Sequence, residues 1–162
     1  MTKAESPIFK VPFRRRREGK TDYKKRLALV KSGKTRLVVR RSNKQVLVQF
    51  IDFHPDGDRT ILSVDGNTLK KNLAYPAKRN VWSAYLAGLY AGKEAGKKGV
   101  KEFVLDTGRY SASKGNIVFA ALKGVLDAGL VTKFGEGKMP LDKLSNPPDK
   151  AAFDAAKQKI IG

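Results

Sequence analysis

The chain of 162 residues is long enough for one domain with a buried core, and its hydrophobic content of 41% excludes a wholly disordered basic protein. Its formal net charge of +19 indicates a strongly anionic partner, and nucleic acid fits better than a membrane surface because neutralising many phosphates rewards many Lys and Arg side chains. The absence of cysteine excludes disulfides and thiolate metal sites.

Residues 1–20 are predicted to form an extended basic arm, because they hold two prolines among charged residues and show no apolar period. Arg14, Arg15, Arg16 and Arg17 are consecutive, and a polyanion would relieve the repulsion between them. Residues 1–44 contain 16 Lys or Arg and three acidic residues, so they carry 13 of the 19 net charges. For such a run taken alone, a solvated tail is the alternative interpretation. The start of the arm lacks the apolar run of a secretory signal, so we expect a cytoplasmic protein.

A helix and three antiparallel strands are predicted after the arm. Thr21 and Asp22 are candidate N-caps of a helix that runs to about Ser32 and ends at Gly33. Three runs rich in Val, Leu, Ile and Phe then predict strands at 35–41, 45–53 and 59–64. Turn residues separate these runs, so the three strands are expected to form a meander.

The second half of the chain predicts two long helices and one more strand. Asn80 should cap a helix over 81–95, preceded by a short helix or irregular connection over 68–80. The apolar run 101–106 predicts a strand parallel to one already formed, and a helix over 116–128 ends at Gly129. Further predictions are a last short strand at 130–134, a linker at 136–150 and a terminal helix at 149–161.

A stripe of small residues marks the helix predicted at 81–95. It consists of Ala84, Gly88, Gly92 and Gly96. Each glycine costs roughly 1 kcal/mol relative to alanine inside a helix, so something must lie close against the stripe. Close packing on the sheet is the favoured interpretation, and a binding groove or a membrane dimer motif is the alternative.

The predicted elements give three segments. They are a basic RNA-binding arm at 1–20, an α/β domain at 21–134, and a linker with a C-terminal helix at 135–162. The domain's meander, crossover helix and parallel strand match a ribonuclease H-like layout, in which strand-end carboxylates bind two metal ions. Asp52, Asp65 and Asp106 are the candidates for a metal-dependent nuclease, although Asp106 is equally well explained as a cap for the turn at Gly108.

Other chemistry finds little support in the sequence. The single histidine, His54, lies in a predicted turn, and no phosphate-binding glycine motif occurs, so we expect no cofactor, no metal and no small-molecule substrate. RNA binding is better supported. Arginine guanidinium groups bind phosphates through paired hydrogen bonds. Three aromatic residues, Phe13, Tyr23 and Tyr110, are interleaved with Arg or Lys, as in proteins whose aromatic side chains stack on RNA bases. For each aromatic alone, core packing is the alternative.

Three stretches resemble a known family. They are FRRRREGKTDYKKRLALVKSGKTRLVVRRSNKQVLVQFI, SAYLAGLYAGKEAGKKGVKEFVLDTG and GNIVFAALKGVLDAGL. They resemble the large-subunit ribosomal protein family that binds 5S ribosomal RNA, numbered eighteen in bacteria and five in eukaryotes. The resemblance runs from about Phe13 to Leu130 and looks like the archaeal and eukaryotic branch, because bacterial members lack this arm.

The resemblance implies a structural, non-enzymatic protein with a three-layer α/β domain and a mixed sheet. It implies 5S rRNA as partner in the central protuberance of the large ribosomal subunit, with 23S-type rRNA and the large-subunit protein numbered five in bacteria as neighbours. By position, it implies RNA contacts at Arg14, Arg15, Arg16, Arg17, Lys20, Tyr23, Lys24, Arg26, Arg40, Arg41, Asn43, Lys44, Arg109, Tyr110 and Lys114.

Overall fold

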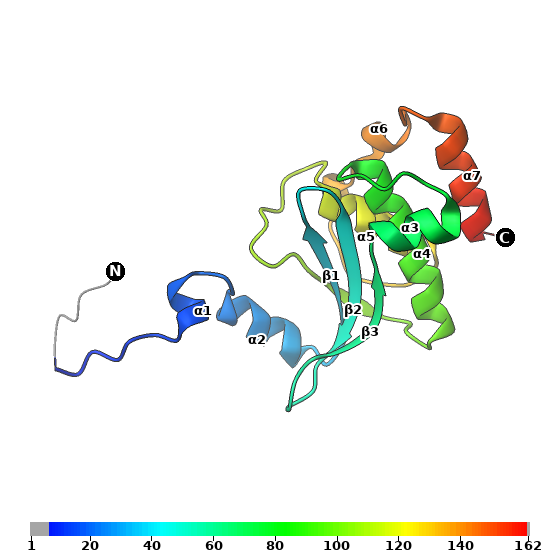
Figure 1. The fold of residues 1–162 in the computed structure, drawn as a ribbon. Helices are drawn as coiled ribbons and strands as arrows, with labels where there is room; N and C mark the ends of the chain where they lie inside the picture. Colours follow the sequence, from blue (N-terminus) through cyan, green and yellow to red (C-terminus); the bar gives the residue numbers. More distant parts are fainter. Residues whose placement is uncertain (1–6, 162) are drawn as a thin grey trace.

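Four strands form a mixed sheet in the order β3-β2-β1-β4 (Figure 1). The computed structural model describes residues 7–161. β1 (Thr35–Arg41) pairs antiparallel with β2 (Val46–Asp52), and β2 pairs antiparallel with β3 (Arg59–Val64). β4 (Phe103–Asp106) pairs parallel with β1. The predicted α/β class, the meander and the added parallel strand are therefore confirmed.

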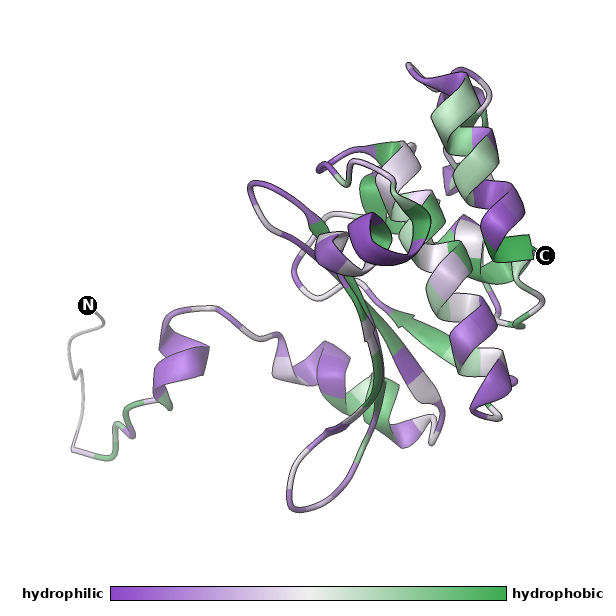
Figure 2. Cartoon of the chain, turned by 45° about the vertical axis from the view of Figure 1, so that its right-hand side comes forward, coloured by the Kyte–Doolittle hydropathy of each residue, from purple (hydrophilic) through white to green (hydrophobic). Residues whose placement is uncertain are grey.

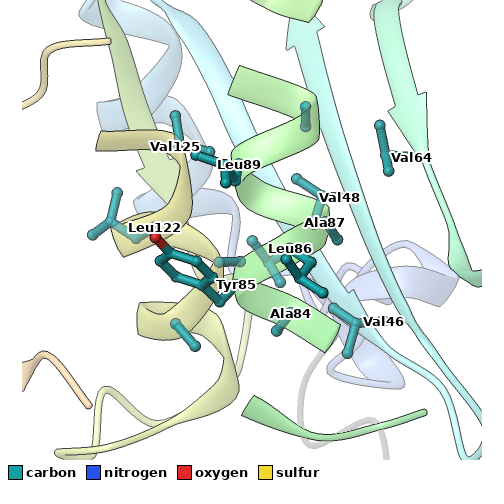
Figure 3. Close-up of a cluster of buried hydrophobic side chains, with 14 of the residues drawn as sticks. Val46, Val48, Val64, Ala84, Tyr85, Leu86, Ala87, Leu89, Leu122 and Val125 are labelled. Carbon is teal, nitrogen blue, oxygen red and sulfur yellow. The ribbon is translucent and has the colours of Figure 1, made fainter. Parts of the chain in front are cut away.

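The core lies on one face of this sheet because the side chains of each strand alternate. On β1, Leu37 and Val39 face α4 (Val81–Lys97) and α5 (Ile117–Asp127), which cover that face. Figure 3 shows the apolar side chains of α4 meeting those of β2 on one side and those of α5 on the other. Arg36 and the other alternate residues of β1 face the opposite side of the sheet.

Side-chain caps fix where three helices begin. Asp22 accepts a hydrogen bond from Lys25 N at 3.1 Å and starts α2 (Tyr23–Lys31). Asn80 accepts one from Ser83 N at 2.8 Å and starts α4, as predicted. Asp65 starts α3 (Gly66–Leu73), which is the short helix expected before the proline at position 76. Each cap satisfies a backbone N–H that has no partner inside its helix.

The cap of α3 makes a testable contribution to stability. The Asp65 carboxylate accepts hydrogen bonds from Thr68 N at 2.9 Å and Thr68 Oγ1 at 2.8 Å, and the backbone bond above all lowers the pKa of Asp65. Asp65→Ala is expected to lower the free energy of unfolding by about 1 kcal/mol at neutral pH. Because the folded pKa is depressed, this contribution is complete above the unfolded pKa of about 3.9 and is lost as the pH falls through the folded value.

Urea unfolding of both proteins at neutral pH and at about pH 2 measures this effect. The difference between Asp65→Ala and the parent should shrink at the lower pH. Asp65→Asn is the matched control, because asparagine caps a helix about as well as aspartate without titrating. A difference for Asp65→Ala that is as large in acid as at neutral pH would contradict this account of the cap.

The glycine stripe of α4 packs on α5, so the prediction that it packs on the sheet is wrong. A Cβ added to Gly88 would lie 2.1 Å from the carbonyl oxygen of Ala121, and one added to Gly124 of α5 would lie 2.2 Å from that of Tyr85. The two helix backbones are therefore in contact, which only glycine permits. Gly96 at the end of the stripe is exposed, and an added Cβ would meet no described atom within 4 Å.

The C-terminal segment packs on the same core as the rest of the domain. The predicted linker contains a 3₁₀ turn (Glu136–Lys138) and the short helix α6 (Leu141–Leu144), and the carbonyl of Lys143 accepts a hydrogen bond from Trp82 Nε1 at 3.0 Å. It is therefore anchored to α4. The terminal helix α7 (Lys150–Ile161) is present as predicted, and its Phe153 packs against Tyr85 with ring centroids 5.8 Å apart.

The last short strand predicted at 130–134 is reduced to one bridge. Val131 pairs in parallel with Glu102, through Phe103 N donating to Val131 O at 3.3 Å and Val131 N donating to Lys101 O at 3.1 Å. The Val131 side chain is exposed. Leu130 beside it is buried in the core, so this segment is held by packing and by one bridge.

The arm and α2 lie on the side of the sheet away from α4 and α5, which completes the predicted three layers (Figures 1 and 2). The arm extends away from the domain, and residues 1–6 of the predicted arm lie outside the described residues. Within it, α1 (Arg14–Arg17) forms one hydrophilic helical turn that was not predicted. Phe13 O accepts hydrogen bonds from two of these arginines, and Glu18 pairs with Arg14 at 3.6 Å and Lys20 at 2.7 Å, which offsets the repulsion.

Candidate nucleic-acid interface

A basic groove separates α2 from the face of the sheet that α4 and α5 leave free. Its volume is about 490 Å³, and the turn at 106–110 after β4 closes one side. Three acidic residues line it: Asp22, Asp58 and Asp106. Its eight basic residues are Arg15, Lys20, Lys25, Arg26, Arg36, Arg40, Arg41 and Arg109. The groove therefore carries an excess of positive charge, which attracts polyanions.

Arg36 pairs with two of these acids from inside the sheet. Arg36 as a whole is 4% exposed, and its guanidinium forms ion pairs with Asp58 at 2.6 Å and with Asp106 at 3.3 Å. Asp58 also pairs with Arg26 of α2 at 2.8 Å. The Nε of Arg36 has no hydrogen-bond partner among the residues that the structure describes. Both carboxylates are paired with arginine. They therefore repel a phosphate in the groove less than free carboxylates would.

Polar contacts hold α2 over this face of the sheet. Lys25 Nζ donates to Thr107 Oγ1 at 2.6 Å and to Gly108 O at 3.3 Å, and Arg26 reaches Asp58. Within its described range, α2 has no buried residue. Asp106 accepts a hydrogen bond from Gly108 N at 2.8 Å, as predicted for a turn cap. The turn thus joins the helix to the end of β4.

The hairpin between β1 and β2 meets the same turn. The guanidinium of Arg41 lies over the ring of Tyr110, 4.4 Å from its centroid. The Tyr110 hydroxyl accepts from Arg41 N at 3.3 Å and donates to Arg41 O at 3.4 Å. On the arm side, a Cβ added to Gly19 would lie 2.2 Å from Arg109 Nη1, so Arg109 lies against the backbone of the arm. Arm, hairpin and turn therefore converge on the basic groove.

The structure brings together seven of the predicted RNA contacts in the groove: Arg15, Lys20, Arg26, Arg40, Arg41, Arg109 and Tyr110. The others lie outside its lining. On the arm, Phe13 precedes α1 and is 88% exposed, and α1 contains Arg14, Arg16 and Arg17. On α2, the exposed residues are Tyr23 and Lys24. The hairpin tip is formed by Asn43 and Lys44, and the loop before α5 contains Lys114. The basic residues among them extend the positive charge along α1, α2, the hairpin tip and the loop before α5.

Two basic residues of the groove were not among the predicted contacts, Lys25 and Arg36. Lys25 lies one position from Lys24 in an equally charged run, and only the direction of the helix distinguishes them. Arg36 shares a strand face with Val38 and Arg40, so strand alternation was the available signal. Its two acidic partners are 22 and 70 residues away in the chain, and sequence reasoning had no means of pairing them.

The nuclease candidates do not form a cluster. Asp52 accepts a hydrogen bond from Thr35 Oγ1 at 2.7 Å, Asp106 pairs with Arg36, and Asp65 caps α3. In the part of the chain that the structure describes, there is no group of three or more His, Cys, Asp or Glu side chains that could hold a metal ion. Within residues 7–161, no helix is long and apolar enough to cross a membrane.

Residues 8–104 match the family model described as ribosomal large subunit proteins 60S L5 and 50S L18. The chain belongs to this family. Among its relatives named large ribosomal subunit protein uL18, the protein of Korarchaeum cryptofilum is 52% identical over 127 residues, covering 78% of this chain and 65% of the relative. Those of Methanothermobacter thermautotrophicus and Aeropyrum pernix are 46% and 47% identical, covering 85% of this chain and 71% and 64% of the relatives.

These matches confirm the predicted ribosomal family and its archaeal type. The chain spans about two thirds of the length of these curated relatives, from 64% to 71%. Because the family consists of ribosomal structural proteins, the prediction that the chain is not an enzyme is confirmed. The nuclease alternative is therefore set aside.

Proposed function

We propose that this chain is a structural protein of the large subunit of the cytoplasmic ribosome and that it binds 5S rRNA, anchoring it in the central protuberance. The observation that carries the proposal is the basic groove flanked by the arginines of α1 and the hairpin tip. The groove and the arm lie on the side of the sheet away from the core helices, and the hairpin tip lies at the end of β1 and β2. Such a surface binds RNA chiefly through phosphates and shape.

The distribution of charge over the fold supports this assignment. Residues 1–44, which form the arm, α2, β1 and the hairpin tip, carry 13 of the 19 net charges. No acidic residue lies in the hairpin turn from Ser42 to Gln45. The opposite side of the sheet is occupied by α4, α5 and α7, which build the core. The division leaves one face for RNA and another for maintaining the fold.

Two further partners belong to the same proposal. The arm extends beyond the groove, so it is available to a second RNA segment, and 23S-type rRNA is the partner that we infer. The large-subunit protein numbered five in bacteria is the protein neighbour that the family resemblance implies. Both assignments depend on the chain occupying the central protuberance.

Binding of 5S rRNA against a transfer RNA control tests the proposed function. At about 150 mM salt we expect the chain to bind 5S rRNA at least tenfold more tightly, because a groove of fixed shape selects among RNAs that carry equal charge per nucleotide. Filter binding or fluorescence anisotropy at matched salt gives both affinities. Equal affinity for the two RNAs would show a general polyanion binder and would contradict the 5S assignment.

A further inference from the structure

The end of β1 extends beyond its neighbour β4. Pairing between these two strands stops at Val38 and Asp106, although β1 continues to Arg41. The Tyr110 hydroxyl occupies the edge left free, bonding both Arg41 N and Arg41 O. Through one hydroxyl it satisfies backbone groups that a longer β4 would have paired. Tyr110 therefore completes the sheet at the site where Arg41 leaves it.

Tyr110 is fixed in this position from several directions. Its N–H donates to Thr107 O at 3.1 Å, and Thr107 is itself bound by Lys25 of α2. Asp106 holds the same turn through Gly108 N, and the Tyr110 ring is partly buried against the core. Phe13, by contrast, is almost fully exposed. A ring so held is poorly placed to swing out and stack on an RNA base.

Arg41 presents its guanidinium from this support. One face lies over the Tyr110 ring, and the residue remains exposed. Among residues 7–161, no carboxylate lies within ion-pair distance of it, unlike Arg26 and Arg36. Stacking on an aromatic ring orients a guanidinium while leaving its N–H edge free to donate. The fork of Arg41 is thus oriented before any ligand arrives.

We propose that Tyr110 is a positioning residue that holds Arg41 as a planar fork for RNA, and that it does not itself stack on a base. The proposal rests on the proposed RNA-binding function and deepens it. The ligand chemistry is a coplanar pair of acceptor atoms, which RNA offers as two phosphate oxygens or as O6 and N7 of guanine. A lysine at position 41 would supply the charge but neither the plane nor the paired donors.

Four variants of the full chain test the proposal by 5S rRNA binding. Arg41→Lys should weaken binding about tenfold, because the bidentate geometry is lost while the charge stays. Tyr110→Leu should weaken it about fivefold through loss of the stack, and Tyr110→Phe less than about threefold, because the ring remains. In the double variant Arg41→Ala with Tyr110→Leu, the tyrosine change should add less than about twofold to the effect of Arg41→Ala alone.

Independent losses in the double variant would overturn the proposal, because a tyrosine that stacks on a base would still cost affinity without Arg41. An Arg41→Lys variant that binds as tightly as the parent would overturn it as well. Thermal unfolding of each variant distinguishes a damaged fold from a lost RNA contact. We expect Arg41→Lys to have the same Tm as the parent. If the parent does not prefer 5S rRNA over transfer RNA, that result contradicts the proposed function. It does not by itself contradict the role proposed here for Tyr110.

Salt dependence then distinguishes the two sources of the acceptor pair. If Arg41 grips a phosphate, the slope of log affinity against log salt for Arg41→Ala should be shallower by about 1. If it reads a guanine edge, the slope should stay that of the parent while the affinity falls. A variant with both the parent slope and the parent affinity would show that Arg41 does not touch the RNA.

Discussion

Replacing Arg14, Arg15, Arg16 and Arg17 by glutamine is expected to weaken 5S rRNA binding by about 10²-fold and to lower the salt slope by about 3. The α1 turn projects these side chains from a segment outside the core, and none of them is buried. We therefore expect them to contribute phosphate contacts without supporting the fold. The parent itself should lose about 10³ to 10⁵ in affinity between roughly 50 and 200 mM salt if it contacts about 6 to 10 phosphates.

A matched variant removes four charges from the other side of the sheet. Lys70, Lys71, Lys150 and Lys159 are exposed on α3 and α7. Their replacement by glutamine lowers the net charge equally but should change the affinity by less than about fivefold, through the long-range field alone. Equal losses in the two variants would show that net charge and not the arm's position governs binding.

Gly88→Ala is expected to lower the free energy of unfolding by about 3 kcal/mol, or roughly 10 °C in Tm. The new methyl would meet the backbone carbonyl of Ala121 at 2.1 Å, and a backbone atom cannot rotate aside. The helices α4 and α5 would have to separate, which opens the packing between Leu89 and Val125. This cost exceeds the gain of about 1 kcal/mol that alanine brings to a helix interior.

Gly96→Ala in the same helix is the control, and its expected effect has the opposite sign. Gly96 is exposed, and the described structure offers no atom within 4 Å of the added methyl. Only the helix preference remains, so stability should rise by about 0.5 kcal/mol. Urea unfolding of both variants measures the pair. Two variants that both stabilise the chain would show that α4 and α5 are not in backbone contact.

Local signals predicted most of the secondary structure. Asp22 and Asn80 are short polar side chains placed before apolar helices, and both cap as expected because the hydrogen bond spans three residues. The strand predicted at 130–134 is reduced to one bridge at Val131, and its apolar residues differ in burial: Leu130 packs in the core, whereas Val131 and Phe134 are exposed. The predicted linker at 136–150 was likewise incomplete, since a contact such as that between Trp82 and Lys143 depends on residues 61 positions apart.

The sequence by itself determined the strand order of the meander, the basic character of the arm and hairpin, and the family, since these depend on neighbouring residues, total charge or extended motifs. The tertiary structure alone decided what the charges do. It buried Arg36 between Asp58 and Asp106, placed Arg41 on Tyr110, and set Gly88 and Gly92 of α4 against α5. Each of these contacts joins segments far apart in the chain, and a side chain's partner there depends on strand register and helix packing, which no local pattern encodes.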